Sequence, residues 1–409
     1  MFGGCMIPGS WLLAVAACAS LLGLSRGLEA QRTWVVDGLN RPGTDFTDFP
    51  PALAAASDGD HIRLRSSTTA FMFYTAANIN KAVSITSDAT SRVVILRPPG
   101  GVFFSVSGIP AGKSVRIANV LCTWQLVVDS CAGTVVLDAI ADPIYAYSNI
   151  VIRNSLAVTI ARSDFKGSGA SGSEPALRTV NSNVSLTACN LEGGPARSSS
   201  ILGAVAIDCT GGTLSLSDCN VRGGGYSGGF PWTMNWPALS SSGTTIMVTI
   251  KASLAAFMAG GGFPGVRAVE TSGGVMIMDP NVTLWDSSLL PDTVSGTAQV
   301  FIRRIPGVTT GKATPGSVVT VDLMCEANAA YGALIALPTP PVSTPWGPFW
   351  LDPNTLSLLD VGIMGPLEKK IVQVPLPSSP ALLTLPIAVQ MIASTSFPVL
   401  SGPSVSVIR

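Results

Sequence analysis

Few residues of this chain have the types and spacing that enzyme chemistry needs. Paired carboxylates are the first candidates, because they act as general acid and base or bind calcium. Five aspartates fall where one side of a repeating structure would gather them: Asp129, Asp138, Asp142, Asp208 and Asp218. No two of them recur at the same position of adjacent repeats. The sequence therefore predicts no catalytic residue, no metal site and no cofactor.

The basic residues give an equally weak catalytic signal. His61 is the only histidine, and we expect it at a solvent-facing strand position rather than in a site. Five arginines fall near predicted corners, where we expect them to face solvent: Arg153, Arg162, Arg178, Arg197 and Arg222. An arginine acting as a lyase base would need a lowered pKa and a positioned sugar.

An aromatic segment is the most distinctive binding signal in the chain. Residues 223–237 are rich in glycine and hold four aromatic side chains within eleven residues: Tyr226, Phe230, Trp232 and Trp236. Flat rings stack on the apolar faces of sugars, and loops on a rigid scaffold often carry function. We predict that these four residues bind substrate. The alternative is that the rings fold back and cover the outside of the scaffold.

A repeated element must position all of these residues. Segments 158–160, 184–186, 214–216 and 275–277 alternate apolar and variable residues, and they begin 26, 30 and 61 residues apart. The last step covers two repeats, with 248–250 as the missing segment. Strands this short bury a face only when they stack on one another. The pattern predicts an all-β fold built of stacked coils.

A column of Asn and Asp follows these strands at a constant offset. Its predicted members form a structural ladder: Asp164, Asn190, Asn220 and Asn281. Asn and Asp adopt the left-handed conformation of a sharp corner, and stacked amides bond to one another along the axis. Cys189 and Cys219 precede two of these positions. We expect a buried stack of small residues there, with a disulfide between them as the alternative.

The segment from 33 to 64 indicates a lid for one end of the stack. A strand at 34–38 is followed by a turn, an Ala-rich helix at 49–56 with prolines in its first turn, and a strand at 62–64. The order strand, "GTDF", helix, "DGDHIRL" resembles the N-terminal cap of pectate-lyase-like right-handed parallel β-helix proteins. The resemblance covers roughly residues 33–300, and its motifs are structural rather than catalytic.

The last hundred residues change character. Prolines cluster after residue 305, and alternating segments at 317–323, 331–337, 370–374 and 387–391 are typical of sandwich strands. The stretch 346–353 is similar to part of a C-terminal β-sandwich module of secreted proteins from environmental bacteria. We therefore predict a right-handed parallel β-helix over 31–304, with an N-terminal helical cap, and a small C-terminal β-sandwich over 305–409.

Composition and the N-terminus indicate where the protein works. Lys plus Arg equals Asp plus Glu at 24 each, so no basic field exists to bind nucleic acid. Residues 11–24 form an apolar stretch too short to span a bilayer, and we predict that residues 1–30 are a cleaved signal peptide. Acylation at Cys18 is the alternative. We expect no transmembrane segment in the mature chain.

Together these features predict a secreted or cell-surface protein that presents a loop surface to a polysaccharide or another surface component. Its alternative is a divergent polysaccharide lyase or glycoside hydrolase of the same fold. The chain has no adjacent Asp pair and no histidine after residue 61, which is why we favour the non-catalytic interpretation.

Overall fold

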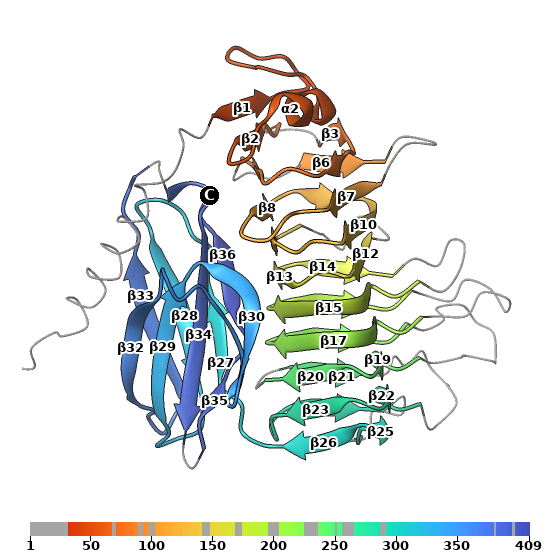
Figure 1. The fold of residues 1–409 in the computed structure, drawn as a ribbon, viewed down its shortest axis with the longest axis vertical. Coiled ribbons are helices and arrows are strands. Elements are labelled where there is room, and N and C mark those ends of the chain that lie inside the picture. The colour runs from red at the N-terminus through yellow and green to blue at the C-terminus, as the bar shows by residue number, and fades with distance from the viewer. Residues whose placement is uncertain are drawn as a thin grey trace, which may run out of the picture.

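A computed structural model describes residues 32–67, 71–88, 93–97, 103–140, 148–167, 174–194, 204–224, 236–249, 252–255, 266–286, 292–379, 382–394 and 397–409. The signal peptide predicted at 1–30 and the alternative acylation site Cys18 lie outside these residues. The described chain is almost entirely β-structure, as predicted, with a parallel β-helix of the right-handed type and about eight turns. An antiparallel β-sandwich lies alongside it (Figure 1).

The β-helix has three parallel ladders. The first, which we call the first sheet, contains β4 (Asn78–Ile79), β7 (Phe104–Ser107), β10 (Trp124–Asp129), β12 (Ser148–Arg153), the first parts of β15 (Leu177–Thr187) and β17 (Ile207–Ser217), β19 (Leu239–Ser242), β22 (Val269–Ser272) and β25 (Ser295–Gly296). Alternate residues of β7 and of β10 are buried in the solenoid interior, which explains the apolar alternation of these segments in the sequence.

The second ladder, the sandwich-facing sheet, contains β1 (Thr33–Val36), β2 (His61–Leu64), β5 (Ser84–Ser87), β8 (Ser114–Ala118), β11 (Thr134–Asp138), β13 (Ala157–Ala161), the second parts of β15 and β17, β20 (Thr245–Val248), β23 (Val275–Met278) and β26 (Gln299–Ile302). All five residues of β11 and of β13 are buried. Both faces of these two strands are therefore covered, one by the solenoid interior and one by the sandwich.

The third ladder, the groove sheet, contains β14 (Asp164–Lys166), β16 (Asn190–Glu192), β18 (Asn220–Arg222), β21 (Ser253–Ala255) and β24 (Thr283–Trp285). Nearer the cap, β3 (Met72–Thr75), β6 (Val93–Leu96) and β9 (Leu121–Cys122) form a separate short ladder. In the groove sheet the middle residue of a strand points inward, and its two neighbours point outward.

The predicted helical cap is confirmed. Helix α2 (Phe49–Ala55) follows Asp48, whose carboxylate accepts a hydrogen bond from the Phe49 N–H at 2.8 Å, and two prolines lie in its first turn. Lys81 Nζ donates to the carbonyls of three residues at the other end of the helix, at 2.7–3.0 Å. These bonds satisfy helix carbonyls that have no partner within the helix.

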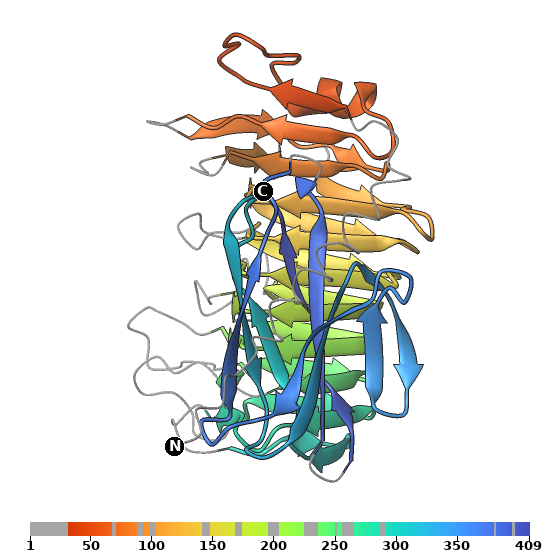
Figure 2. The ribbon, with the colours of Figure 1, turned by 90° about the vertical axis from the view of Figure 1, so that its left-hand side faces the viewer.

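The C-terminal region forms two main antiparallel sheets and a hairpin. One sheet is β27 (Gly307–Thr310), β28 (Val318–Met324) and β33 (Lys369–Pro375); the other is β32 (Ser357–Ile363), β29 (Ala330–Ala336), β34 (Pro386–Ser394), β35 (Val399–Leu400) and β36 (Ser404–Val407); the hairpin is β30 (Pro338–Thr344) with β31 (Gly347–Leu351). The strands of the C-terminal region run along the solenoid axis, across the coils (Figure 2). The first of them begins five residues after the last solenoid strand ends.

Small polar residues on the sandwich-facing sheet permit close contact with the sandwich. Ser185 Oγ and Thr187 Oγ1 both donate to the Pro403 carbonyl, at 3.4 and 3.0 Å. A Cβ atom on Gly402 would lie 2.3 Å from Ser215 Oγ. In these strands the sequence alternates inward-facing apolar residues with outward-facing Ser and Thr. The outward residues are small because the backbone of the sandwich, rather than solvent, lies against the outer face of the sheet.

Strand pairing corrects the predicted repeat at its C-terminal end. Val158, Val184 and Leu214 are in register as expected. In the next two coils Leu214 pairs with Ile246, and Ile246 pairs with Met276, so the predicted segment 248–250 is displaced by two residues and 275–277 by one. Apolar residues occupy successive positions in these segments, which made a short slip invisible in the sequence pattern.

Candidate functional site

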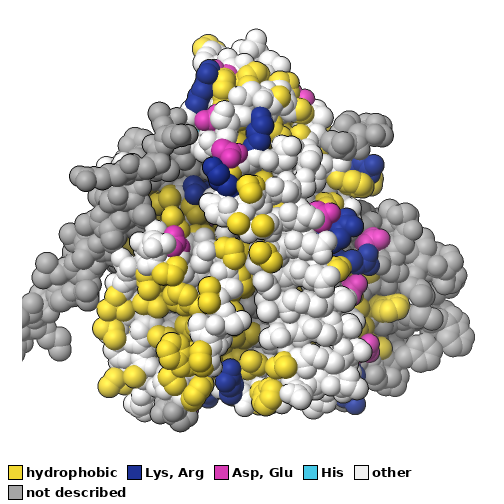
Figure 3. Space-filling view, in the orientation of Figure 1, with side chains coloured by type: hydrophobic (Ala, Val, Ile, Leu, Met, Phe, Trp, Pro, Cys, Tyr) yellow, Lys and Arg dark blue, Asp and Glu magenta, His cyan; other side chains and the backbone are white. Residues whose placement is uncertain are grey.

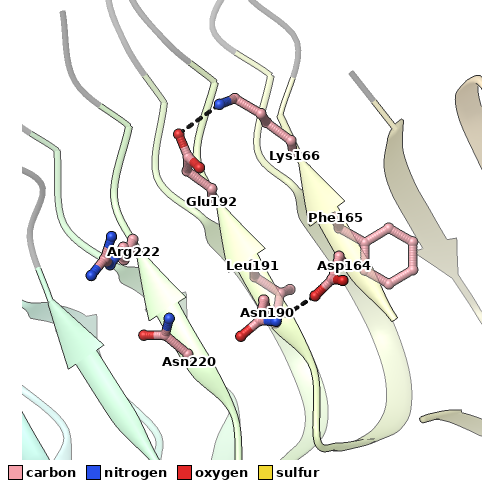
Figure 4. A pocket seen from close by; sticks show the side chains of 8 residues that line it. All are labelled: Asp164, Phe165, Lys166, Asn190, Leu191, Glu192, Asn220 and Arg222. Carbon is pink, nitrogen blue, oxygen red and sulfur yellow. Dashed lines mark hydrogen bonds and ion pairs between the residues drawn. The ribbon is translucent and has the colours of Figure 1, made fainter. Parts of the chain in front are cut away.

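A surface hollow lies on the groove sheet, over β14, β16 and β18 (Figure 4). It is a half-open hollow of about 610 Å³, a volume that includes open solvent. Six side chains from three successive coils point out into it, and we call them the groove face: Asp164, Lys166, Asn190, Glu192, Asn220 and Arg222. Between them the middle residues Phe165, Leu191 and Val221 are buried in the solenoid core.

Strand register arranges the groove face in two columns. Asp164, Asn190 and Asn220 are paired directly across adjacent strands, and so are Lys166, Glu192 and Arg222. Neighbouring strands are about 4.8 Å apart, so each column repeats at that interval along the solenoid. The second column continues through the position of Ala255 to Trp285, whose side chain is partly exposed. The face is therefore polar, linear and periodic.

Neighbouring coils bind one another through the groove face. Lys166 Nζ lies 2.8 Å from Glu192 Oε1, and Asn190 Nδ2 donates to Asp164 Oδ1. Within the described part of the chain Arg222 makes no ion pair, and its side chain is exposed. The charges of the four ionised residues of the face cancel. The Arg222 guanidinium, which has no ion-pair partner among the described residues, is the group of the face best placed to take a ligand.

The ladder prediction is corrected in two respects. Asp164, Asn190 and Asn220 do share a register, but Thr283 holds the corresponding position in the last coil, and Asn281 lies two residues before it. The left-handed corner residues are instead those two positions earlier, Arg162, Ala188 and Asp218. The Asn ladder begins strands and faces solvent; it does not make the corners.

A glycine follows directly after β14, β16 and β18, the three strands that carry the groove face. A Cβ on Gly193 would lie 2.0 Å from the Ala204 carbonyl oxygen, and one on Gly223 would lie 1.8 Å from that of Trp236. The Gly193 N–H donates to the Arg222 carbonyl at 2.8 Å. These close approaches require glycine, and they pin the points where the chain leaves and re-enters the coil. We call these points the glycine necks.

Three of the four predicted aromatic binding residues, Tyr226, Phe230 and Trp232, lie outside the described residues. Trp236 is partly buried at a glycine neck, and its indole Nε1 is buried with no hydrogen-bond partner in the part of the chain that is described. The prediction that all four bind substrate stays a prediction. Trp236 itself is part of the neck.

Two predictions about basic residues are wrong. His61 is buried, and its Nε2 lies 2.7 Å from Thr86 Oγ1; burial, with a smaller contribution from Arg63, lowers its pKa to about 4. Arg162 does not face solvent but lies under the sandwich, where it pairs with the buried Asp138. Both errors arise from neighbours distant in sequence.

The remaining predicted residues are dispersed. Asp208 accepts from Arg178 Nε at 3.2 Å across β15 and β17, and Asp218 occupies a corner. Asp129 and Arg153 are opposite one another at the ends of β10 and β12, whereas Asp142 and Arg197 lie outside the described residues. Among the described residues no group of three or more His, Cys, Asp or Glu side chains is arranged to hold a metal ion.

Sequence reasoning missed Lys166 and Glu192. The signal that would have found them is the repeated order of an Asn or Asp, an apolar residue, a charged residue and a glycine. Figure 3 shows charged side chains along the edge of the solenoid that faces away from the sandwich, and apolar side chains over the sandwich. Four of the six groove-face side chains are charged, on a protein in which charged residues make up only 12% of the sequence.

A scan against protein-family models and a search of curated proteins both find no match for this chain. The parallel β-helix is shown by the structure alone, and no family match confirms the resemblance to pectate-lyase-like proteins. Of the described residues, no helix is both long and apolar enough to cross a membrane.

Proposed function

We propose that the protein is an exported, non-catalytic β-helix that binds an extended polysaccharide along the groove face. The observation that carries the proposal is the pair of in-register polar columns, which repeat along the axis at one strand spacing. A ligand that meets polar groups at a constant interval is one with a regular repeat. Export is supported by the apolar stretch at residues 11–24.

The chemistry of the groove face suits a ligand rich in hydroxyl groups. Asn190 and Asn220 each offer both donors and acceptors, Arg222 offers five donors, and Glu192 accepts. Trp285, two coils beyond Arg222 in the same column, supplies a partly exposed ring able to stack on a sugar. The carboxylates Asp164 and Glu192 already bind neighbouring side chains, which supports a binding role over acid–base catalysis.

Binding to a polysaccharide array tests the proposal. We expect the unaltered protein to bind at least one polysaccharide on the array. We expect the double variant Asn190→Ala/Arg222→Ala to bind that polysaccharide with an affinity at least tenfold lower. Arg63→Ala is the matched control, because Arg63 is another half-exposed solenoid arginine, paired with Asp88 far from the groove face. The control should bind as the unaltered protein does.

Three results would contradict the proposal. The first is no retention on any polysaccharide, and the second is equal binding by the double variant and the unaltered protein. The third is turnover, followed through new reducing ends and unsaturated products, that is lost on changing Asp208 or Asp218. That result would favour the divergent enzyme instead.

A further inference from the structure

The end of the solenoid opposite the helical cap leaves interior residues uncovered. Helix α2 closes the first end, whereas β26 is the last strand at the other (Figure 1). Val300 and Ile302 pair with Met276 and Met278, which are only 0% and 8% exposed. Val300 and Ile302 face the same interior, yet they are 40% and 56% exposed. Nothing in the described chain covers them.

The backbone of β26 is equally open. Within the described residues it pairs with β23 on one side and with no strand on the other. Natural edge strands are usually protected by charges, prolines or bulges. The strand Gln299–Ile302 has no charge and no proline, and its register with β23 is unbroken. It is therefore a template for pairing with another strand.

The apolar surface extends from β26 to the sandwich. Phe301 is 50% exposed, and Phe397 is 54% exposed. Phe397 lines a hollow of about 290 Å³ together with Arg304 and Ile305, which follow β26 almost directly. We call Val300, Phe301, Ile302 and Phe397 the solenoid-end surface.

We infer that this surface binds a second copy of the same chain, through antiparallel pairing of β26 with its equivalent. A two-fold axis at Phe301 places Val300 opposite Ile302 and Gln299 opposite Arg303. No like charges then face each other, and the two exposed interiors become one continuous core. The contact is isologous because both copies use the same strand. Since α2 covers the other end of each solenoid, no further copy can add there, and the assembly closes as a dimer.

Sedimentation equilibrium of the full chain over a range of concentrations tests this inference. We expect the mass of a dimer at micromolar concentration, and the mass of a monomer for Val300→Lys/Ile302→Lys, because lysines on an edge strand block pairing. Ile363→Lys is the matched control, since Ile363 is a 73% exposed residue on the sandwich edge strand β32. The control should remain dimeric.

Chemical cross-linking gives a second measurement that does not depend on a disruptive variant. Phe301→Cys lies on the proposed axis and should cross-link to its equivalent through a short bifunctional maleimide, whereas Ile363→Cys should not. A monomeric mass at every concentration, masses above the dimer, or dissociation by Ile363→Lys alone would each overturn the inference.

Discussion

Asp138 Oδ1 lies 2.6 Å from Arg162 Nη2, and the Asp138 side chain is completely buried between the solenoid and the sandwich. Its other oxygen, Oδ2, accepts from the Val407 N–H at 3.2 Å and lies 3.4 Å from Arg409 Nη2. Arg162 also donates to the Thr310 carbonyl at 2.7 Å. One carboxylate therefore organises contacts between two parts of the chain that are about 270 residues apart.

We predict that Asp138→Ala lowers the free energy of unfolding by about 3–5 kcal/mol, because it leaves buried guanidinium groups without their counter-ion. Guanidinium chloride denaturation measures the effect. Asp88→Ala breaks the exposed pair with Arg63 and should cost about 1 kcal/mol or less. Equal losses for the two variants would show that the sandwich contact does not depend on Asp138.

His61 should make the stability depend on pH in the acidic range. The pKa is lowered from 6.5 to about 4 in the folded protein, so the unfolded chain binds the proton more readily. The stabilisation from neutral His61 is fully present above about pH 6.5 and is lost as the pH falls toward 4, by roughly 3 kcal/mol in total.

Denaturation curves of the unaltered protein and of His61→Gln, recorded between those two pH values, measure this dependence. Other groups titrate in both proteins, so the difference between their free energies of unfolding at each pH isolates the contribution of the histidine. This difference in free energy should shrink as the pH falls. A difference that stays constant with pH would mean that the burial of His61 does not perturb its protonation.

Adding a single methyl group at a glycine neck should lower the stability of the protein. Gly223→Ala places its Cβ 1.8 Å from the Trp236 carbonyl oxygen, so the backbone must shift. We expect the free energy of unfolding to fall by about 1–3 kcal/mol, as overpacking usually costs. Gly365→Ala is the control, because a Cβ there meets no atom within 4 Å. Thermal melting of both variants compares the two sites.

The six cysteines that the structure describes should be unreactive in the folded protein. Cys122, Cys131, Cys189, Cys209, Cys219 and Cys325 are all free and buried. Burial raises the pKa of Cys209 and Cys325 to about 12 and that of Cys189 well above its ordinary value, so almost no thiolate forms near neutral pH. The alternative of a Cys189–Cys219 disulfide is not seen.

Alkylation followed by peptide mapping checks this prediction. All six cysteines should resist iodoacetamide under native conditions and react in denaturant without prior reduction. Protection of Cys189 and Cys219 that persists in denaturant and disappears on reduction would instead reveal a disulfide between them.

The sequence by itself determined the solenoid, because every coil must present apolar residues to the same interior at short, alternating spacing. That requirement is local, so it appears at Val158, Val184 and Leu214 without any knowledge of the fold. It also determined the helical cap, since Asp48 and the two prolines that follow Phe49 begin a helix through local bonds.

Only the tertiary structure decided what lies outside the coils. The sequence pattern places Arg162 in solvent, and only the fold shows that the sandwich covers it and that it pairs with the buried Asp138. His61 likewise is expected to be exposed until Thr86 and its neighbours bury it. The groove face likewise exists only because register brings Lys166, Glu192 and Arg222 into one column. These relationships join residues about 25 to 270 positions apart, and the pattern of nearby residues carries no information on such contacts.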